Sequence, residues 1–297
     1  QIFLKIFLVI LVVGVEEEAE KQISMDSYDE IRALVARHCR DIVESENTVI
    51  GQERRATDTI GRFLFDGNEQ RLDGAFESTP FTNLTEAADR FIGRKKELEE
   101  IRERMLAGAR ILTLIGPGGM GKTRLAQVFG TENLSSFPGG VWFCDLTEAS
   151  TEDAVLRCIA SVLGVQLSEE DAVSQLAHVL HARGRILLIV DNMEQVVNFA
   201  DATLGTWVQR APEARFIVTS RVRLGLHAEE LFLLEPLSHE EGVQLFVDRA
   251  RRIRTDFSMS EDEVSAVDDI VERLDRMSLA IELAAARVSL MCPTQIQ

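Results

Sequence analysis

The chain has 297 residues, enough for about two domains, and its 45% hydrophobic and 27% charged residues are typical of a soluble globular protein. Its formal net charge of −17 argues against direct binding of nucleic acid or of an anionic membrane, because like charges repel. The cysteines show no paired spacing, so we expect incidental thiols of a reducing cytoplasm rather than a disulfide or a metal site: Cys39, Cys144, Cys158 and Cys292.

Residues 1–87 form a poorly defined N-terminal region and linker. Residues 2–15 are apolar apart from Lys5, a run that is short for a membrane span, and no small-residue cleavage site follows it. We favour a buried strand or helix of a truncated upstream domain over a targeting or anchoring segment. His38 belongs to a helical pattern without a partner at metal-ligand or triad spacing, and residues 77–83 (ESTPFTN) predict a linker. Because the chain starts with Gln, we expect a piece of a longer protein.

A glycine loop follows a predicted buried strand at residues 111–115. The letters are ILTLI and then GPGGMGKT, and a helix with an apolar side is expected next. Glycines let backbone N–H groups curl around an anionic oxygen without a Cβ in the way. Lys122 can then reach the β- and γ-phosphates of a nucleotide, and the Thr123 hydroxyl can hold Mg²⁺ at the positive end of the helix.

The alternative for this segment is a glycine-rich turn with an unrelated lysine. Two observations favour the phosphate loop. The loop lies between a predicted strand and a predicted helix, and Lys122 is the only lysine after Lys96.

Strand and helix patterns alternate beyond the loop, which predicts an α/β fold with a parallel five-stranded sheet and helices on both faces. The expected strands are 111–115, 141–146, 186–190, 215–219 and 231–234. Ser150 with Asp153, and Ser168 with Asp171, predict two helix starts, and a further helix is expected over 194–209.

Asp191 follows the buried strand 186–190 directly. Parallel sheets bind ligands at the carboxyl ends of their strands, so this carboxylate can support the Mg²⁺ water shell beside Thr123. The alternative is that Asp191 or Asn192 caps the next helix. Many ATPases carry a water-activating carboxylate where this chain has Asn192, so we expect slow hydrolysis, with Glu194 as the nearest candidate base.

An arginine ends the fourth predicted strand. Arg221 is a candidate contact for the γ-phosphate, whereas Arg223 is better explained as a surface residue. Before the loop, the turn Ile92, Gly93 and Arg94 leads into an amphipathic helix and can fold back over a base and its sugar.

Helices without further strands are predicted from residue 237 onward. Ser238 with Glu241 and Ser260 with Glu263 form capping boxes, and a last helix starts near residue 278. Basic residues near the end of the first of these helices complement its carboxyl end more readily than they form a nucleic-acid patch: Arg249, Arg251, Arg252 and Arg254. We therefore expect a nucleotide-binding domain over 88–236 and a small helical lid domain over 237–297, truncated at its C-terminus.

Six segments together resemble the NTPase module of the STAND class of P-loop NTPases, close to NB-ARC domains and to LuxR/AfsR-type bacterial regulators. They are FIGRKKELEEI, LTLIGPGGMGKTRLA, ILLIVDNMEQV, FIVTSRVRLGL, LLEPLS and LDRMSLAIELAAAR, in the family's order and within residues 88–297.

The resemblance implies an AAA+/STAND-like P-loop fold that binds ATP or ADP with Mg²⁺. Asp191 would be the Walker B carboxylate and Arg221 the sensor arginine, which gives a catalytic set of Lys122, Asp191, Glu194 and Arg221 and a metal set of Thr123 and Asp191. The nucleotide-binding residues would be Ile92, Gly93, Arg94, Gly116, Pro117, Gly118, Gly119, Met120, Gly121, Lys122, Thr123 and Arg124.

Two departures from the family pattern bear on this expectation. Where the family usually has Gly-Leu-Pro-Leu, this chain has Arg276, Met277, Ser278 and Leu279, which puts the lid's contact with the base in doubt. The family's winged-helix domain and downstream repeats have no counterpart in these residues, so a switch built from them alone would be incomplete.

The sequence thus predicts a cytoplasmic ATP/ADP-binding switch module of a signal-transduction or transcriptional regulator, with slow Mg²⁺-dependent ATP hydrolysis and with protein partners or self-association through flanking domains. The alternative is a degenerate nucleotide-binding scaffold that makes protein contacts without turnover. A GTPase is disfavoured because no Asn-Lys-x-Asp segment is present. A ring-forming motor ATPase is neither indicated nor excluded.

Overall fold

The structure is a computed structural model that describes residues 82–85, 89–168 and 171–297. The apolar run 2–15, His38, Cys39 and residues 77–81 of the expected linker lie outside the described residues. None of the helices in the described ranges is both long and apolar enough to cross a membrane.

Within these ranges, five parallel strands form one sheet, as the sequence predicted, and their order is β2-β3-β4-β1-β5. The strands are β1 (Ile111–Ile115), β2 (Val141–Asp145), β3 (Leu187–Asp191), β4 (Arg215–Ser220) and β5 (Glu229–Leu233). Because the strands are parallel and in register, their carboxyl ends meet at one edge of the sheet: Ile115 pairs with Ser220, and Asp145 pairs with Asp191.

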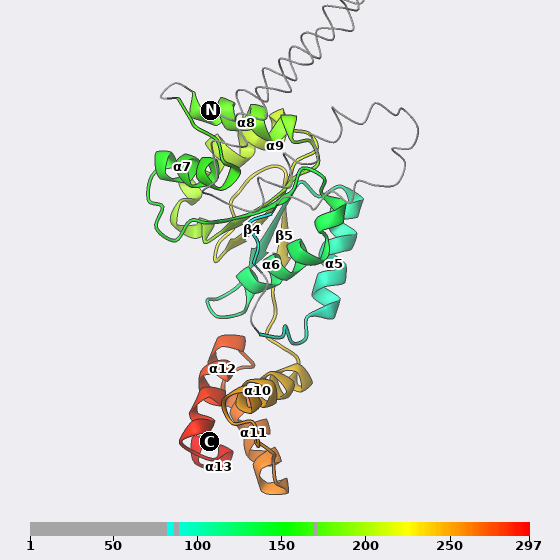
Figure 1. Cartoon of the computed structure of the whole chain (residues 1–297), viewed down its shortest axis with the longest axis vertical. Helices are drawn as coiled ribbons and strands as arrows, with labels where there is room; N and C mark the ends of the chain where they lie inside the picture. Colours follow the sequence, from blue (N-terminus) through cyan, green and yellow to red (C-terminus); the bar gives the residue numbers. More distant parts are fainter. Residues whose placement is uncertain (1–81, 86–88, 169–170) are drawn as a thin grey trace, which may run out of the picture. The chain divides into compact units, whose positions relative to one another are not determined.

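Helices cover both faces of this sheet (Figure 1). One face packs against α5 (Lys95–Ala107) and α6 (Lys122–Glu132), and the other against α7 (Glu152–Leu163), α8 (Ala172–Ala182) and α9 (Thr206–Arg210). Strand β3 shows why both layers form: Leu187 and Ile189 enter the first core, whereas Leu188 and Val190 enter the second. A strand that is apolar at every position is buried on both sides.

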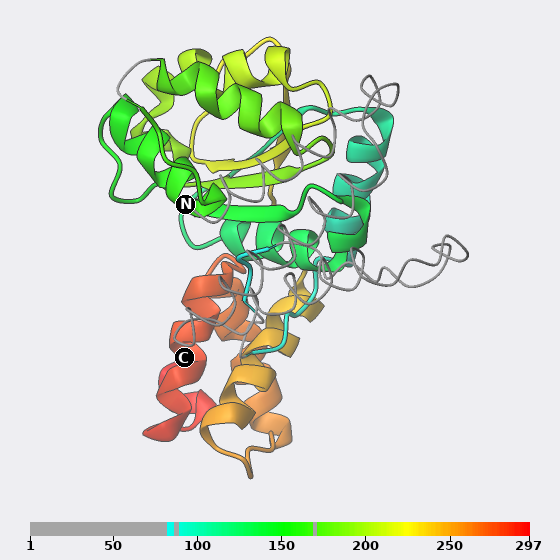
Figure 2. The same cartoon turned by 45° about the horizontal axis from the view of Figure 1, so that its top comes forward.

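Four helices follow the sheet and form a group of their own (Figure 2). They are α10 (His239–Ile253), α11 (Glu261–Arg273), α12 (Ser278–Ala286) and α13 (Pro293–Ile296), and we call them the C-terminal helices. They share a separate hydrophobic core that includes Phe246, Val267 and Ile281. Both predicted capping boxes are present, at Ser238 with Glu241 and at Ser260 with Glu263.

The expected helix starts before α7 and α8 were one and three residues early. Thr151 caps α7 by accepting a hydrogen bond from the Ala154 amide, so Ser150 is not the cap. Asp171 caps α8 by accepting from the Ser174 amide, and Ser168 lies outside that helix. Ser, Thr and Asp are all good caps, and only the backbone path decides which of several neighbours is used.

The helix expected over 194–209 was wrong in most of its length. Two 3₁₀ turns, Met193–Gln195 and Val197–Phe199, and a π turn, Asp201–Gly205, precede α9. Apolar residues at a spacing of three or four satisfy each of these helix types, so the pattern alone cannot separate them.

Part of the expected linker pairs with the sheet. Thr82 forms a parallel bridge to Val141, and the Asn83 side chain both accepts from the Phe143 amide at 2.7 Å and donates to the Phe143 carbonyl at 2.8 Å. Leu84 joins the core beneath α6. These residues satisfy main-chain groups on the open edge of β2, a task that their loop-like composition does not reveal.

Candidate functional site

The glycine loop connects β1 to α6 and takes a backbone path that other residues rarely adopt. Gly119 has φ +79° and Gly121 has φ +88°, both in the left-handed region, and Gly121 immediately precedes the first residue of α6. A Cβ at Gly118 would lie 3.3 Å from Nη2 of Arg221. The loop therefore needs glycine at positions 119 and 121 for its turns, and at position 118 glycine lets the Arg221 side chain lie close to the backbone.

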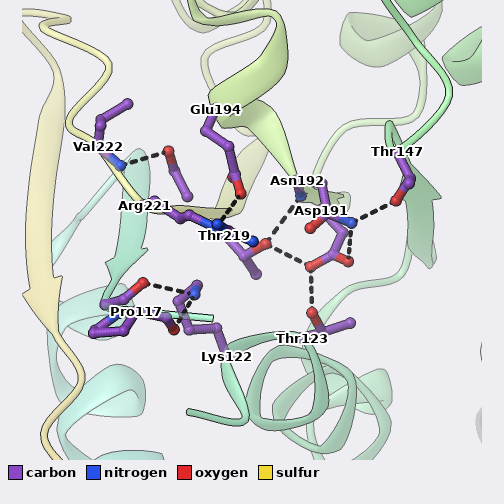
Figure 3. Close-up of polar contacts among 12 residues, drawn as sticks. Pro117, Lys122, Thr123, Thr147, Asp191, Asn192, Glu194, Thr219, Arg221 and Val222 are labelled. Carbon is purple, nitrogen blue, oxygen red and sulfur yellow. Dashed lines mark hydrogen bonds and ion pairs between the residues drawn. The ribbon is translucent and has the colours of Figure 1, made fainter. Parts of the chain in front are cut away.

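Lys122 lies folded over this loop. Its Nζ donates to the carbonyls of Gly116 at 2.7 Å and of Pro117 at 2.8 Å (Figure 3). Burial lowers the pKa of Lys122, Arg221 lowers it further, and Glu194 and Asp191 act in the opposite direction. The ammonium group is thus held at the loop by two neutral carbonyl oxygens. A phosphate anion forms stronger hydrogen bonds with an ammonium group and can replace them.

Asp191 ends β3 and faces the start of α6 (Figure 3). Its Oδ1 accepts hydrogen bonds from the hydroxyls of Thr123 at 2.7 Å and of Thr219 at 2.5 Å. The side chain is buried, with 3% of the residue exposed, and burial raises the pKa of Asp191 despite these bonds. The two residues expected to support a metal, Thr123 and Asp191, therefore lie in direct contact.

Asn192 joins three polar groups at the same sheet edge. Its Nδ2 donates to Asp191 Oδ2 at 2.9 Å, to Asp145 Oδ1 at 3.1 Å and to Thr147 Oγ1 at 2.8 Å. Its φ of +62° is one that asparagine tolerates better than most residues. Neither side chain caps the following turn, so the alternative capping role for Asp191 or Asn192 is not supported.

Asp145 was not among the expected site residues. It ends β2 beside Asp191 in the register, and burial opposes its ionisation, but hydrogen bonds from Thr147 and Asn192 outweigh that effect and lower its pKa. Thr219 was missed too. The sequence signal for both residues was a polar side chain at the carboxyl end of a strand, β2 for Asp145 and β4 for Thr219. In the observed order these two strands flank β3.

Glu194 and Arg221 form an ion pair near Gly118 of the glycine loop. Glu194 Oε1 lies 3.1 Å from Arg221 Nε, while Glu194 Oε2 is buried and has no hydrogen-bond partner among the described residues. The Arg221 side chain is 66% exposed and can move. As placed, the pair neutralises the carboxylate that we expected to serve as a base.

Arg94 points inward rather than into an open pocket. The residue is 3% exposed; its Nη1 donates to Glu97 Oε1 and to the Glu235 carbonyl at 2.7 Å each, and its Nη2 donates to the Met120 carbonyl at 3.3 Å. Arg94 therefore ties the start of α5 to the glycine loop. Gly93 lies against the Glu241 side chain, which would be 2.7 Å from a Cβ at that position.

The cavity between Arg94 and the glycine loop is small, whereas a separate cavity of about 1330 Å³ touches Ile92 and Gly93 beside α5, β5 and α10. A cavity of 40 Å³ lies between Ile92, Arg94, Gly121, Arg124 and the C-terminal helices. One water needs about 10–15 Å³ of cavity, and ligand pockets measure about 300–1,000 Å³, so no purine fits there in this arrangement. Arg124 is committed to Asp89, with Nη2 2.6 Å from Oδ1.

The C-terminal helices contact the glycine loop directly. The Leu279 amide donates to the Gly119 carbonyl at 3.0 Å, and the Ser278 hydroxyl donates to the Met120 carbonyl at 3.4 Å. Arg249 on α10 reaches Asp89 at 2.5 Å and Glu282 at 2.9 Å. The departure from Gly-Leu-Pro-Leu thus falls on residues that touch the loop's main chain.

Residues 104–218 match the AAA domain family. An uncharacterized protein of Mycobacterium tuberculosis (strain ATCC 25618 / H37Rv) is 38% identical over 208 residues, which are 69% of this chain and 52% of that protein. A candidate HTH-type transcriptional regulator of the same strain is 33% identical over 65% of this chain and 22% of its own length. The regulatory protein AfsR of Streptomyces griseus is 28% identical over 67% of this chain and 21% of its own length. The chain thus spans about half of the first of these relatives and about a fifth of the other two.

Two solved structures share the fold at low identity. The Walker-type ATPase PABY2304 of Pyrococcus abyssi superposes with a TM-score of 0.52 at 16% identity, over 69% of this chain and 70% of that chain. Cdc6p of Pyrobaculum aerophilum gives 0.52 at 15% identity, over 68% and 61%. The fold of the chain is that of the AAA-type P-loop NTPases, and residues 104–218 form an AAA-type nucleotide-binding module.

Proposed function

We propose that residues 88–297 are an ATP/ADP-binding switch module of a cytoplasmic signal-transduction or transcriptional regulator, with slow Mg²⁺-dependent ATP hydrolysis. One observation carries the proposal: the glycine loop, Lys122, Thr123 and Asp191 converge at the carboxyl edge of the sheet, with the Thr123 hydroxyl 2.7 Å from the Asp191 carboxylate. The regulators among the relatives are the reason for assigning the module to a regulator rather than to a metabolic enzyme.

The loop offers a phosphate two kinds of donor. Main-chain amides at the amino end of α6 carry partial positive charge, and the Lys122 ammonium lies beside them on two carbonyls. A nucleotide's terminal phosphates form stronger, charge-assisted hydrogen bonds with Lys122 than those carbonyls do. We therefore expect Lys122 to move from its own loop onto the ligand.

The residues at the sheet edge fit a magnesium ion that is shared with the nucleotide. Mg²⁺ keeps several waters and binds through one or two protein oxygens plus phosphates, and Thr123 and Asp191 supply that number. Among the described residues no group of three or more His, Cys, Asp or Glu side chains could hold a metal alone, so the phosphates are needed to complete the site. When bound, the ion would neutralise phosphate charge.

Slow hydrolysis follows from what surrounds the position of the attacking water. Asn192 cannot accept a proton, and its amide is already bound to Asp145, Thr147 and Asp191. Glu194 is paired with Arg221. General-base help is worth about 10²–10⁴-fold, and neither residue is free to give it in this arrangement.

The space expected for the adenine of the nucleotide is nearly closed, and this supports a switch that opens to exchange nucleotide. The 40 Å³ cavity must enlarge before a purine can enter, and its wall includes Ser278 and Arg249 of the C-terminal helices. These helices hold the loop through Leu279 and reach Asp89 through Arg249. Nucleotide exchange would therefore require these contacts to break, which couples occupancy of the site to the position of the helices.

The same small cavity also favours the rival function, a degenerate scaffold that binds protein partners without turnover. In that case Lys122, Leu279 and Arg249 keep the observed contacts permanently, and added nucleotide finds no room for its base.

Equilibrium titration with labelled ATP and ADP, followed by phosphate release under single-turnover conditions, separates the two functions. The switch predicts saturable binding of both nucleotides and slow Mg²⁺-dependent release, both lost in Lys122→Ala and retained in Lys96→Ala, a control at an exposed lysine of α5. Absence of binding would overturn the proposed switch and support the scaffold, whose closed cavity leaves no room for the base. Binding without phosphate release would overturn the claim of slow hydrolysis.

A further inference from the structure

Two cysteines that are distant in sequence meet at the carboxyl end of β2. Cys144 lies on β2 and is buried, and Cys158 lies on α7 and is half-buried. Their sulfur atoms are 2.8 Å apart, and a disulfide bond measures about 2.05 Å, so an approach of roughly 0.8 Å joins them. Both cysteines are free thiols, as expected from the sequence, but the sequence did not predict that they meet, because the contact depends on the packing of α7 on β2.

We propose that Cys144 and Cys158 are the site of a reversible disulfide, formed by reaction with a peroxide and reversed by a dithiol. This inference does not depend on nucleotide binding. It rests on the sulfur–sulfur contact, on the half-exposed position of Cys158 and on the absence of a third ligand: no group of three or more His, Cys, Asp or Glu residues in the described ranges could hold a metal.

The two sulfurs are suited to different roles. The hydrogen bond between the two thiols lowers the pKa of Cys158, although burial and Asp145 oppose this. The same hydrogen bond and burial raise the pKa of Cys144, so its proton stays in place. Cys158 is therefore the more readily ionised and the more accessible of the two thiols, and Cys144 is the resolving thiol behind it.

The chemistry balances in two steps. The Cys158 thiolate attacks one peroxide oxygen, the O–O bond breaks, and the leaving oxygen takes a proton, which leaves a sulfenic acid and, from hydrogen peroxide, water. The Cys144 sulfur then attacks the Cys158 sulfur, the S–O bond breaks, and the Cys144 proton leaves with the hydroxide as a second water. The two sulfurs lose two electrons, and the peroxide gains them.

This disulfide would form next to the candidate nucleotide site. Cys158 Sγ donates to the main-chain carbonyl of Asp145 at 3.4 Å, and the Asp145 carboxylate accepts from Asn192, which also binds Asp191. Oxidation would therefore fix α7 to the end of β2, one residue from the polar network at the sheet edge.

Peptide mapping tests the pair directly, because trypsin cuts after Arg157 and separates the two cysteines. The full chain is treated with hydrogen peroxide, alkylated, digested and analysed by mass spectrometry. We expect residues 125–157 and 158–183 to appear as one linked species, two hydrogens lighter than their sum, and to separate after treatment with dithiothreitol.

Variants exclude the other cysteines. A Cys39→Ser, Cys292→Ser background should keep the link; serine is a good cap at position 292, which precedes α13. Cys158→Ser should abolish the link, as should Cys144→Ala, which avoids a buried hydroxyl. Peroxide-treated wild type in which Cys144 and Cys158 remain alkylatable, or in which Cys158 is oxidised only to sulfinic acid, would overturn the proposal.

Discussion

Replacing Asn192 with aspartate tests whether one amide holds the carboxylates of the site together. Nδ2 lies 2.9 Å from Asp191 Oδ2 and 3.1 Å from Asp145 Oδ1. Asn192→Asp removes both hydrogen bonds and puts a third carboxylate in their place. Since Asp145 is exposed, the contact with the buried Asp191 dominates the cost.

The magnitude follows from two limits. Two like charges about 3 Å apart repel by roughly 5 kcal/mol at an effective dielectric constant of about 20. Binding a proton relieves that repulsion and costs about 4 kcal/mol at pH 7 for an acid with an ordinary pKa of about 3.9. Losing a hydrogen bond to a charged acceptor costs about 1.5–3 kcal/mol. A protonated aspartate can donate to Asp191 in place of the amide, so the two costs are alternatives and not a sum, and we expect Asn192→Asp to lower the free energy of unfolding by roughly 2–4 kcal/mol at pH 7.

The pH dependence identifies the cause. Repulsion raises the pKa of the new carboxyl group in the folded state, so its penalty is absent below the unfolded pKa of about 3.9 and grows as pH rises toward the folded pKa. Urea unfolding at about pH 4 and pH 7 measures this, with Asn192→Gly as the control, because glycine accepts φ +62° and adds no charge. The excess loss of the aspartate variant over the glycine variant should shrink at low pH. An excess that is equal at both pH values would refute the reasoning.

Three further changes have expected outcomes. Asp89→Asn breaks the ion pairs to Arg124 at 2.6 Å and to Arg249 at 2.5 Å and should speed nucleotide association several-fold in stopped-flow measurements, whereas Asp153→Asn, in an exposed ion pair, should not. Equal association rates in Asp89→Asn and wild type would show that these ion pairs do not limit nucleotide entry. Hydrogen bonds to Glu272 and Asp268 raise the pKa of His239, so the protonated histidine stabilises the fold at low pH and this stabilisation is lost as pH rises through the raised pKa. His239→Gln should therefore reduce the difference between the melting temperatures at about pH 6 and at about pH 9. A difference equal to that of wild type would contradict this role of His239. Arg221→Gln should reduce the preference for ATP over ADP by about tenfold in equilibrium titrations, whereas the control Arg223→Gln should not. Both variants should have free energies of unfolding within about 0.5 kcal/mol of wild type. An unchanged preference in Arg221→Gln would exclude a contact between Arg221 and the γ-phosphate.

The sheet was predictable because its signals are local. Strands β1 and β3 are short apolar runs, and the glycine loop carries its own backbone requirement at Gly119 and Gly121. The place of Asp191 at the carboxyl end of β3 could be predicted because it follows such a run, and its carboxylate lies there in contact with the Thr123 hydroxyl.

The rest of the site depends on which strands become neighbours. Thr219 and Asp145 lie on strands that flank β3 only because the order is β2-β3-β4-β1-β5, and no local pattern states that order. The inward orientation of the Arg94 side chain also depends on residues distant in sequence. The turn at Arg94 was predictable, but its hydrogen-bond partners Glu235 and Met120 are 141 and 26 residues away. The meeting of Cys144 and Cys158 is a third example.

Calorimetric titration of ATP into the purified chain, with and without Mg²⁺, tests the central claim most directly. The account predicts saturable binding that tightens with Mg²⁺, and it predicts that Thr123→Val loses most of this Mg²⁺ effect, because the hydroxyl 2.7 Å from Asp191 is gone while the side-chain volume is kept. The absence of saturable binding, or the same Mg²⁺ effect in Thr123→Val as in wild type, would contradict it.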